Sequence, residues 1–184
     1  MNTFVVLVED HPGVLTRVSG LIRRRGFNID SLTVGHTETI GVSRMTIAVE
    51  ADEFGARRIE ANLYKLLEVL RVDNVTRQPS IFRELAILKV KTTPDTRAQI
   101  FQLAQVYRAR IIDVSTESLV IEITGNEDKV ESLIDVLQPY GIVETARTGR
   151  LAMLRGTGIA STPPGDEQDL SAVTAEEDLI SHSV

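Results

Sequence analysis

The chain opens with an apolar, β-branched run, Thr3–Val8, and then switches to a helical pattern. The run is typical of a buried strand. Apolar residues then recur at helical spacing, which predicts a helix from Gly13 to Arg25, and Gly26 is a favourable residue just past a helix end. The polar turn between strand and helix, Glu9–Leu15, is the first candidate for chemistry.

Further periodic segments follow as far as residue 77. Phe27–Val34 and Ser43–Val49 alternate with a period of two, which predicts half-buried strands. Asp52 is placed to cap a second helix, and Val69–Val75 predicts a fourth strand. The order is therefore β-α-β-β-α-β. The apolar positions expected on the second helix are Ile59, Leu63, Leu66 and Leu67.

The same order of patterns repeats after Gln78-Pro79, although the residues themselves do not repeat. We therefore predict an α+β protein with two ferredoxin-like domains, residues 1–77 and 80–157, each an antiparallel sheet with two helices on one face. The predicted elements of the second domain are strands at Ile81–Val90, Arg110–Val114, Leu119–Ile123 and Ile142–Ala146, and helices opened by Thr93-Pro94-Asp95 and by Gly125-Asn126-Glu127.

Residues 158–184 differ from the rest in composition. They hold six acidic residues and no Lys or Arg, so the remaining 20 acids balance the 20 bases and the net charge of −6 belongs to this tail. We predict a disordered acidic tail, with a partner-binding helix at Thr174–Ile180 as the alternative. A neutral body gives no support to nucleic-acid binding.

Composition also limits location and metal chemistry. No apolar run reaches the ~20 residues of a membrane span, and no cationic leader precedes the first strand. The chain has no cysteine. We therefore expect a cytoplasmic protein without disulfides or membrane contact. His11, His36 and His182 lack ligand spacing, so no metal site is predicted.

Enzymatic and RNA-binding motifs are absent or incomplete. There is no Walker loop, G-x-S-x-G elbow or H-E-x-x-H, and Gly156-Thr157-Gly158 lacks the third glycine of a dinucleotide fingerprint. Glu9 and Asp10 are adjacent at a strand end and point to opposite sides, so they do not form an acid–base pair. Arg25-Gly26-Phe27 imitates the start of an RNA-binding motif, but the eight aromatic residues leave few platforms for bases.

The turn before the first helix offers a binding position for a carboxylate. Gly13 lets a ligand approach the backbone, and the N–H groups of Gly13, Val14 and Leu15 have no intrahelical acceptors. The helix dipole favours a negative group at this position. Pro12 suits a first helical position because its missing N–H costs no bond there. On local chemistry alone, an ordinary strand-to-helix turn is the alternative.

The strand at Phe27–Val34 supplies a second half of the site. In this topology it lies at the sheet edge, where it can pair with another copy and bring Asn28 near the first turn of that copy. A branched amino acid there would place its carboxylate on the helix N–H groups and its ammonium on Asp10 and Asn28. As an alternative, Asn28 is a local turn residue after Gly26. The apolar lining would comprise Val14, Leu15 and Ile29.

Three segments closely resemble the small regulatory subunit of acetohydroxyacid synthase, also called acetolactate synthase. They are Val8–Val18, Arg24–Val34 and Ser43–Ile47, and residues 25–34 (R-G-F-N-I-D-S-L-T-V) are highly specific. The resemblance continues to about residue 157 and implies that the first domain is an ACT domain, an effector-binding form of this fold. The further matching pieces are Lys65-Leu66-Leu67, Arg83–Ala86, Ile111–Val114, Arg147-Thr148-Gly149 and Leu154-Arg155-Gly156.

The resemblance implies a non-catalytic regulatory subunit. It would activate a separate catalytic subunit and confer feedback inhibition by valine, or another branched-chain amino acid, bound at the interface of an ACT homodimer. The catalytic partner would condense pyruvate with pyruvate or 2-oxobutyrate, using thiamine diphosphate, Mg²⁺ and FAD, and this chain would hold no cofactor. The family's effector contacts fall on Asp10, Gly13, Val14 and Leu15 of one copy and on Asn28 and Ile29 of the other.

One position departs from the family pattern. Many members carry Asn where this chain has Asp10, whose carboxylate would attract the ammonium of an effector but repel its carboxylate. A stand-alone amino-acid-responsive ACT-domain regulator stays open as the alternative function, and a small isomerase-like enzyme ranks behind it.

Overall fold

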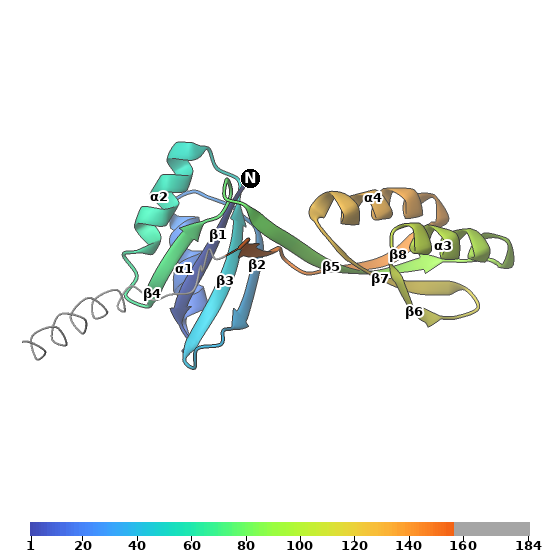
Figure 1. Ribbon diagram of the computed structural model, residues 1–184, viewed down its shortest axis with the longest axis horizontal. Helices are drawn as coiled ribbons and strands as arrows, with labels where there is room; N and C mark the ends of the chain where they lie inside the picture. Colours follow the sequence, from blue (N-terminus) through green and yellow to red (C-terminus); the bar gives the residue numbers. More distant parts are fainter. Residues whose placement is uncertain (157–184) are drawn as a thin grey trace, which may run out of the picture.

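The computed structural model describes residues 1–156 of the chain. Two α+β domains follow one another along the sequence, each with helices on one face of an antiparallel sheet, which confirms the predicted fold class (Figure 1). The predictions for the tail, residues 158–184, lie outside the described residues.

The first domain has a four-stranded sheet in the order β2-β3-β1-β4. Residues Thr3–Val8 of the central strand are all buried, as the apolar run predicted. Alternate residues of that strand, Phe4, Val6 and Val8, pack under both helices in the first core. The elements are β1 (Asn2–Glu9), α1 (Val14–Arg24), β2 (Ile29–His36), β3 (Val42–Val49), α2 (Glu53–Leu63) and β4 (Val69–Asn74).

The second domain repeats this topology with strand order β6-β7-β5-β8. Thr93 caps its first helix, since its side chain accepts a hydrogen bond from the N–H of Thr96. A separate core lies between this sheet and its two helices. The elements are β5 (Ser80–Lys91), α3 (Pro94–Val106), β6 (Arg110–Val114), β7 (Ser118–Gly125), α4 (Glu127–Leu137), the short helix η1 (Gln138–Tyr140), β8 (Ile142–Arg147) and β9 (Leu151–Leu154).

The second helix ends earlier than its apolar pattern predicts. Asp52 caps α2 as expected and accepts a 2.7 Å bond from the N–H of Gly55. However, the backbone tightens after Leu63, where the N–H of Leu66 bonds to the carbonyl of Leu63 at 3.0 Å. Leu66 therefore packs against the core from a turn, and Leu67 is 93% exposed. Their assignment to the helix is wrong because the chain reverses here to enter β4.

Strand β9 was not predicted. It pairs with the first residues of β5, from Ser80 to Arg83, and the two form a ribbon. Ala152 of this ribbon packs with Val5 and Val75, on the face of the first sheet opposite the helices. Four residues are too few to show an alternating pattern, so only the packing reveals the strand.

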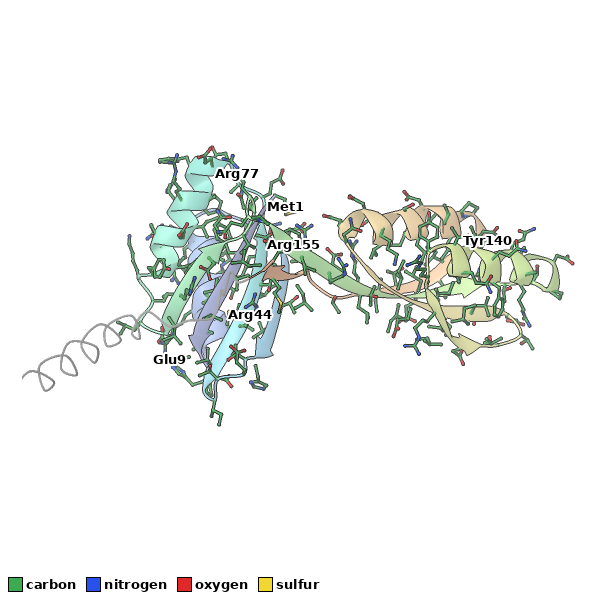
Figure 2. All side chains as sticks on the ribbon, in the orientation of Figure 1. Met1, Glu9, Arg44, Arg77, Tyr140 and Arg155 are labelled. Atoms are coloured by element: carbon green, nitrogen blue, oxygen red, sulfur yellow. The ribbon has the colours of Figure 1, made fainter. Side chains whose placement is uncertain are left out.

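The directions of the strands set the ends of the first sheet. β1 and β2 both run antiparallel to β3 and therefore parallel to each other. β1 runs from Met1, close to the second domain, to Glu9 at the opposite end of the first domain (Figure 2). The start of β2 therefore lies beside the second domain, and its end lies beside the first turn.

Candidate effector site

The turn between β1 and α1 leaves the start of the helix open. Gly13 precedes the first helical residue with φ +94°, a left-handed conformation that glycine adopts at no steric cost. A Cβ at this position would meet no atom of residues 1–156 within 4 Å. The helix was predicted to begin close to Pro12 or Gly13, and its first helical residue is Val14, one residue after Gly13.

Several N–H groups at this helix start are available to a ligand. The N–H of Val14 has a weak acceptor, the carbonyl of His11 at 3.5 Å, which corrects the prediction that it is free. Within residues 1–156, the N–H groups of Gly13, Leu15 and Thr16 have no acceptor, and no side chain caps the helix. The helix dipole makes this group of donors favourable for an anion.

Asp10 lies beside the end of β2. Its N–H donates to the carbonyl of Gly41 at 2.8 Å, and its carboxylate lies 3.1 Å from Nδ1 of His36, the last residue of the strand. Both side chains are solvent-accessible, at 40% for Asp10 and 85% for His36. Sequence reasoning missed His36 because only the pairing of β2 with β3 brings it to the turn.

The buried side chain of Glu68 contacts the start of α1, next to the turn. The Glu68 side chain is 10% exposed and forms an ion pair with Arg17 of α1. The backbone carbonyl of Glu68 also accepts a 2.9 Å bond from the N–H of Glu9. These two contacts fix the helix start against the connection between α2 and β4, and neither has a sequence signal.

The two halves of the predicted site lie at opposite ends of α1. Asn28 is exposed and precedes β2, which begins at Ile29 and not at Phe27 as predicted. An open groove of about 440 Å³ runs between α1 and residues 27–29. Because α1 has 11 residues, it separates the turn from Asn28 by about 16 Å. One copy of the chain therefore does not bring the two halves together.

The apolar side chains of the predicted site differ in accessibility. Val14 is 3% exposed and belongs to the first core, with Val18, Leu21 and Ile22 on the same helical face. Its side chain does not line the site, contrary to the prediction, and only its backbone faces the turn. Leu15 is 43% exposed and Ile29 is half-buried, so both present apolar surface to a ligand.

Within residues 1–156, no group of three or more His, Cys, Asp or Glu side chains is placed to hold a metal ion. In the same part of the chain, every helix is too short or too polar to cross a membrane.

Comparison with known proteins covers both domains. The model of an AHAS small subunit-like ACT domain matches residues 4–71, and that of the small subunit of acetolactate synthase matches residues 83–156. The probable acetolactate synthase small subunit of Archaeoglobus fulgidus is 52% identical over 155 residues, which are 84% of this chain and 97% of that protein. The acetolactate synthase small subunit of Bacillus subtilis is 46% identical over 151 residues, 82% of this chain and 88% of that protein.

A solved structure indicates the same family as these relatives. The crystal structure of the acetolactate synthase small subunit from Thermotoga maritima superposes with a TM-score of 0.79 at 44% identity. The match covers 84% of this chain and 97% of that chain. The chain therefore belongs to the family of acetolactate synthase small subunits, and its first domain is an ACT domain.

Proposed function

We propose that this chain activates the catalytic subunit of acetolactate synthase and makes it sensitive to feedback inhibition by valine. Valine is held between the ACT domains of two copies, and thiamine diphosphate, Mg²⁺ and FAD belong to the catalytic partner. The choice of valine and of this partner follows from the family. The observation that carries the proposal is the open helix start at Gly13, beside an unpaired sheet edge.

Pairing through β2 completes the site. β2 is one of the two edge strands of its sheet, so one row of its backbone groups has no strand partner within residues 1–156. Two copies joined antiparallel through β2 place the start of one strand opposite the end of the other. Because His36 at that end contacts Asp10, Asn28 of the second copy comes close to the helix start of the first.

Each part of valine has a complementary group in this arrangement. The carboxylate accepts hydrogen bonds from the N–H groups at the start of α1, where the dipole favours it. The ammonium donates to the carboxylate of Asp10 and to the side-chain oxygen of Asn28 from the second copy. The isopropyl group contacts Leu15 and Ile29, which are the accessible apolar residues.

Reconstitution tests this function. Titrating the purified chain into the catalytic subunit is expected to raise the rate of acetolactate formation, and valine is expected to reverse the increase. The two proteins should also co-purify. Failure to bind the catalytic subunit or to change its rate, with valine binding retained, would contradict the proposal and favour a stand-alone ACT-domain regulator.

Asp10→Asn is expected to tighten valine binding about fivefold. The substitution removes a negative charge near the valine carboxylate, while the amide oxygen still accepts from the ammonium. Repulsion between two unit charges about 4 Å apart in water is about 1 kcal/mol, which corresponds to this ratio. Calorimetric titration of the chain with valine measures the effect. Asp135→Asn on α4 is the matched control and should bind as the wild type, whereas weaker binding by Asp10→Asn would show that attraction of the ammonium outweighs repulsion of the valine carboxylate, contrary to this prediction.

A further inference from the structure

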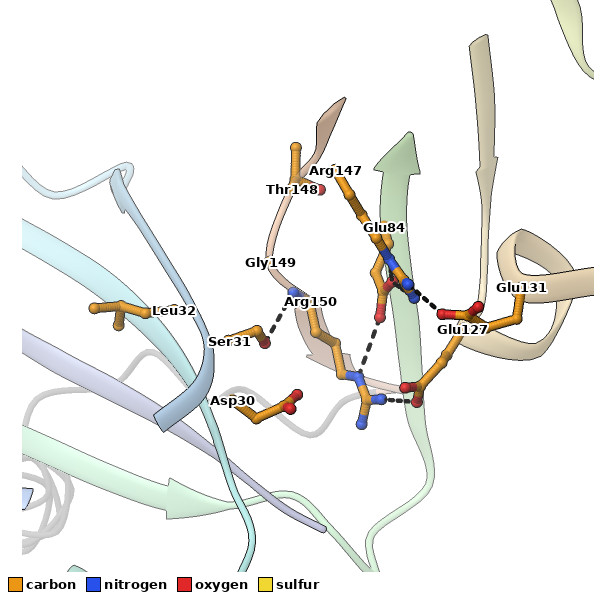
Figure 3. A pocket seen from close by; sticks show the side chains of 10 residues that line it. All are labelled: Asp30, Ser31, Leu32, Glu84, Glu127, Glu131, Arg147, Thr148, Gly149 and Arg150. Atoms are coloured by element: carbon orange, nitrogen blue, oxygen red, sulfur yellow. Dashed lines mark hydrogen bonds and ion pairs between the residues drawn. The ribbon is translucent and has the colours of Figure 1, made fainter. Parts of the chain in front are cut away.

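The segment Thr148–Arg150 joins the second domain to the edge strand of the first. Gly149 lies so close to β2 that a Cβ would stand 2.5 Å from Oγ1 of Thr33 and 3.0 Å from the carbonyl oxygen of Leu32. Oγ1 of Thr33 is buried here without a hydrogen-bond partner among the described residues. Figure 3 shows the segment passing beside β2. Only glycine allows this approach, because a Cβ would clash with β2.

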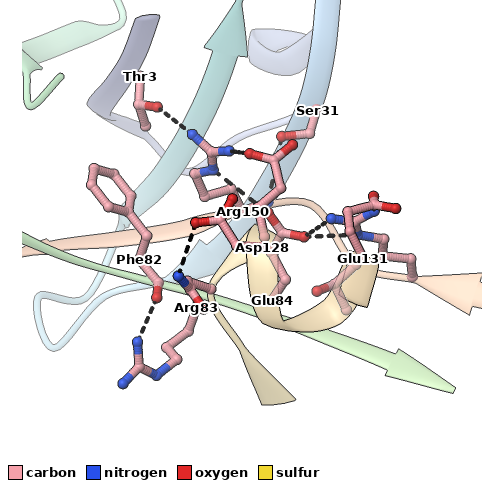
Figure 4. Close-up of polar contacts among 12 residues, drawn as sticks. Thr3, Ser31, Phe82, Arg83, Glu84, Asp128, Glu131 and Arg150 are labelled. Atoms are coloured by element: carbon pink, nitrogen blue, oxygen red, sulfur yellow. Dashed lines mark hydrogen bonds and ion pairs between the residues drawn. The ribbon is translucent and has the colours of Figure 1, made fainter. Parts of the chain in front are cut away.

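Arg150 continues the contact with the first domain. Its backbone N–H donates to Oγ of Ser31 on β2 at 3.4 Å, and its guanidinium donates to Oγ1 of Thr3 on β1 at 3.4 Å (Figure 4). The guanidinium also lies over the ring of Phe82, 5.5 Å from its centre. Its side chain is only 14% exposed.

The same guanidinium holds two carboxylates of the second domain. Its Nε lies 3.5 Å from Oε1 of Glu84 on β5, and its Nη2 forms an ion pair with Glu127 on the first turn of α4. The Glu84 side chain is 6% exposed. Geometric fit decides the strength of a buried ion pair, so a displaced guanidinium weakens its contact with Glu84 most, since Glu127 is 45% exposed. Arg150 thus connects β1 and β2 to β5 and α4.

Arg147 provides an internal contrast. It pairs with the same Glu84, at 2.5 Å from Nη2 to Oε2, and with Glu131 on α4. Burial lowers the pKa of Arg147, but hydrogen bonds and charges from Glu131 and Glu84 outweigh it, so the pKa is raised. Both partners of this side chain lie in the second domain. Arg147 therefore organises the second domain without reaching the first.

The start of β2 is irregular between the proposed valine contacts and this junction. Ile29 pairs with Val49 and Ser31 pairs with Ala48, so Asp30 forms a bulge between them. A bulge leaves one residue outside the ladder and bends the strand locally. Ser31, which contacts Arg150, is two residues from Ile29. A ligand on Asn28 and Ile29 therefore acts next to Arg150 of the same copy.

We propose that Arg150 is the positioning residue that couples valine binding to the second domain, an inference that rests on the proposed function. Valine at the helix start of one copy contacts the start of β2 in the other copy. It displaces Ser31 relative to Arg150 there, and the ion pairs to Glu84 and Glu127 carry the displacement to β5 and α4. The second domain then changes how it acts on the catalytic subunit.

Thermodynamic linkage supplies a test that a purely structural role would not pass. If valine and the catalytic subunit affect each other's binding, each changes the affinity of the other by the same factor, commonly five- to 150-fold. We expect Arg150→Met to keep the valine affinity of the free chain and to keep activation. With this variant, valine should bind equally well with and without the catalytic subunit and should no longer inhibit.

Arg147→Met is the matched control. It also removes one arginine from Glu84, but it leaves the contacts between the domains in place, so valine should still inhibit. Normal inhibition with Arg150→Met would overturn the proposal and leave the proposed function intact, and so would loss of activation by a folded variant. A wild-type chain that does not bind valine would refute the proposed function as well.

Gly149→Ala tests the same junction without removing a charge. Its Cβ would push the segment away from Thr33, so coupling between valine and the catalytic subunit should fall while valine affinity stays. Adding Thr33→Ala removes the Oγ1 atom that the new Cβ meets, and should partly restore inhibition. Full inhibition with Gly149→Ala alone, or no recovery in the double variant, would contradict coupling through this segment.

Discussion

Gly13→Asp is expected to abolish valine inhibition and to leave activation of the catalytic subunit intact. The new side chain enters the open space above the helix start, where its carboxylate occupies the place of the effector carboxylate and repels it. Any side chain is strained at φ +94°, although aspartate tolerates a left-handed conformation better than most residues, so retained activation also checks that the variant is folded. We expect the valine concentration for half-inhibition to rise at least ~100-fold, or ~3 kcal/mol.

Steady-state rates of the reconstituted enzyme over a range of valine concentrations measure this effect. Gly156→Asp is the matched control because Gly156 also has a positive φ, +70°, and no atom of the described residues lies within 4 Å of its Cβ position. It adds the same charge and similar strain away from the helix start, so valine should still inhibit. Retained inhibition in Gly13→Asp would place the effector elsewhere.

Leu88→Ala is expected to unfold the second domain selectively. Leu88 lies at the centre of β5 with no exposed surface and belongs to the second core. Removing a buried leucine side chain costs about 2–5 kcal/mol, because it leaves a cavity as well as losing apolar contact. We expect the melting temperature of the second domain to fall by about 10–30 °C. The first core contains no residue of this domain, so valine should still bind.

Calorimetric scans of the full chain measure this difference. Ile47→Ala is the companion variant, since Ile47 is equally buried in the first core. It should shift the other transition and weaken valine binding instead. A single transition that moves as a whole in both variants would contradict separate folding of the two domains.

The order of elements was predictable because each domain has a strong periodic signal. The buried run at Thr3–Val8 and the caps at Asp52 and Thr93 mark where strands and helices begin, and the edge position of β2 follows from the topology. The short strand β9 gave no such signal, since its place depends on packing of Ala152 against Val5.

The candidate site was predictable only in part. Gly13 at the helix start and the exposed Leu15 that follows two residues later are local features that the sequence shows directly. Val14 was misassigned because an apolar residue at a helix start can face either a ligand or the core. Val14 lies on the same helical face as Val18, and both side chains pack in the first core. His36 and Arg150 had no signal, since their contacts join residues 26 and 119 positions apart in the chain.

A crystal structure of the chain grown in saturating valine tests the shared site most directly. We expect two copies joined along their β2 edges, with one valine at each helix start and its ammonium against Asn28 of the neighbouring copy. Helix starts without valine, or copies that meet through a different surface, would contradict the account.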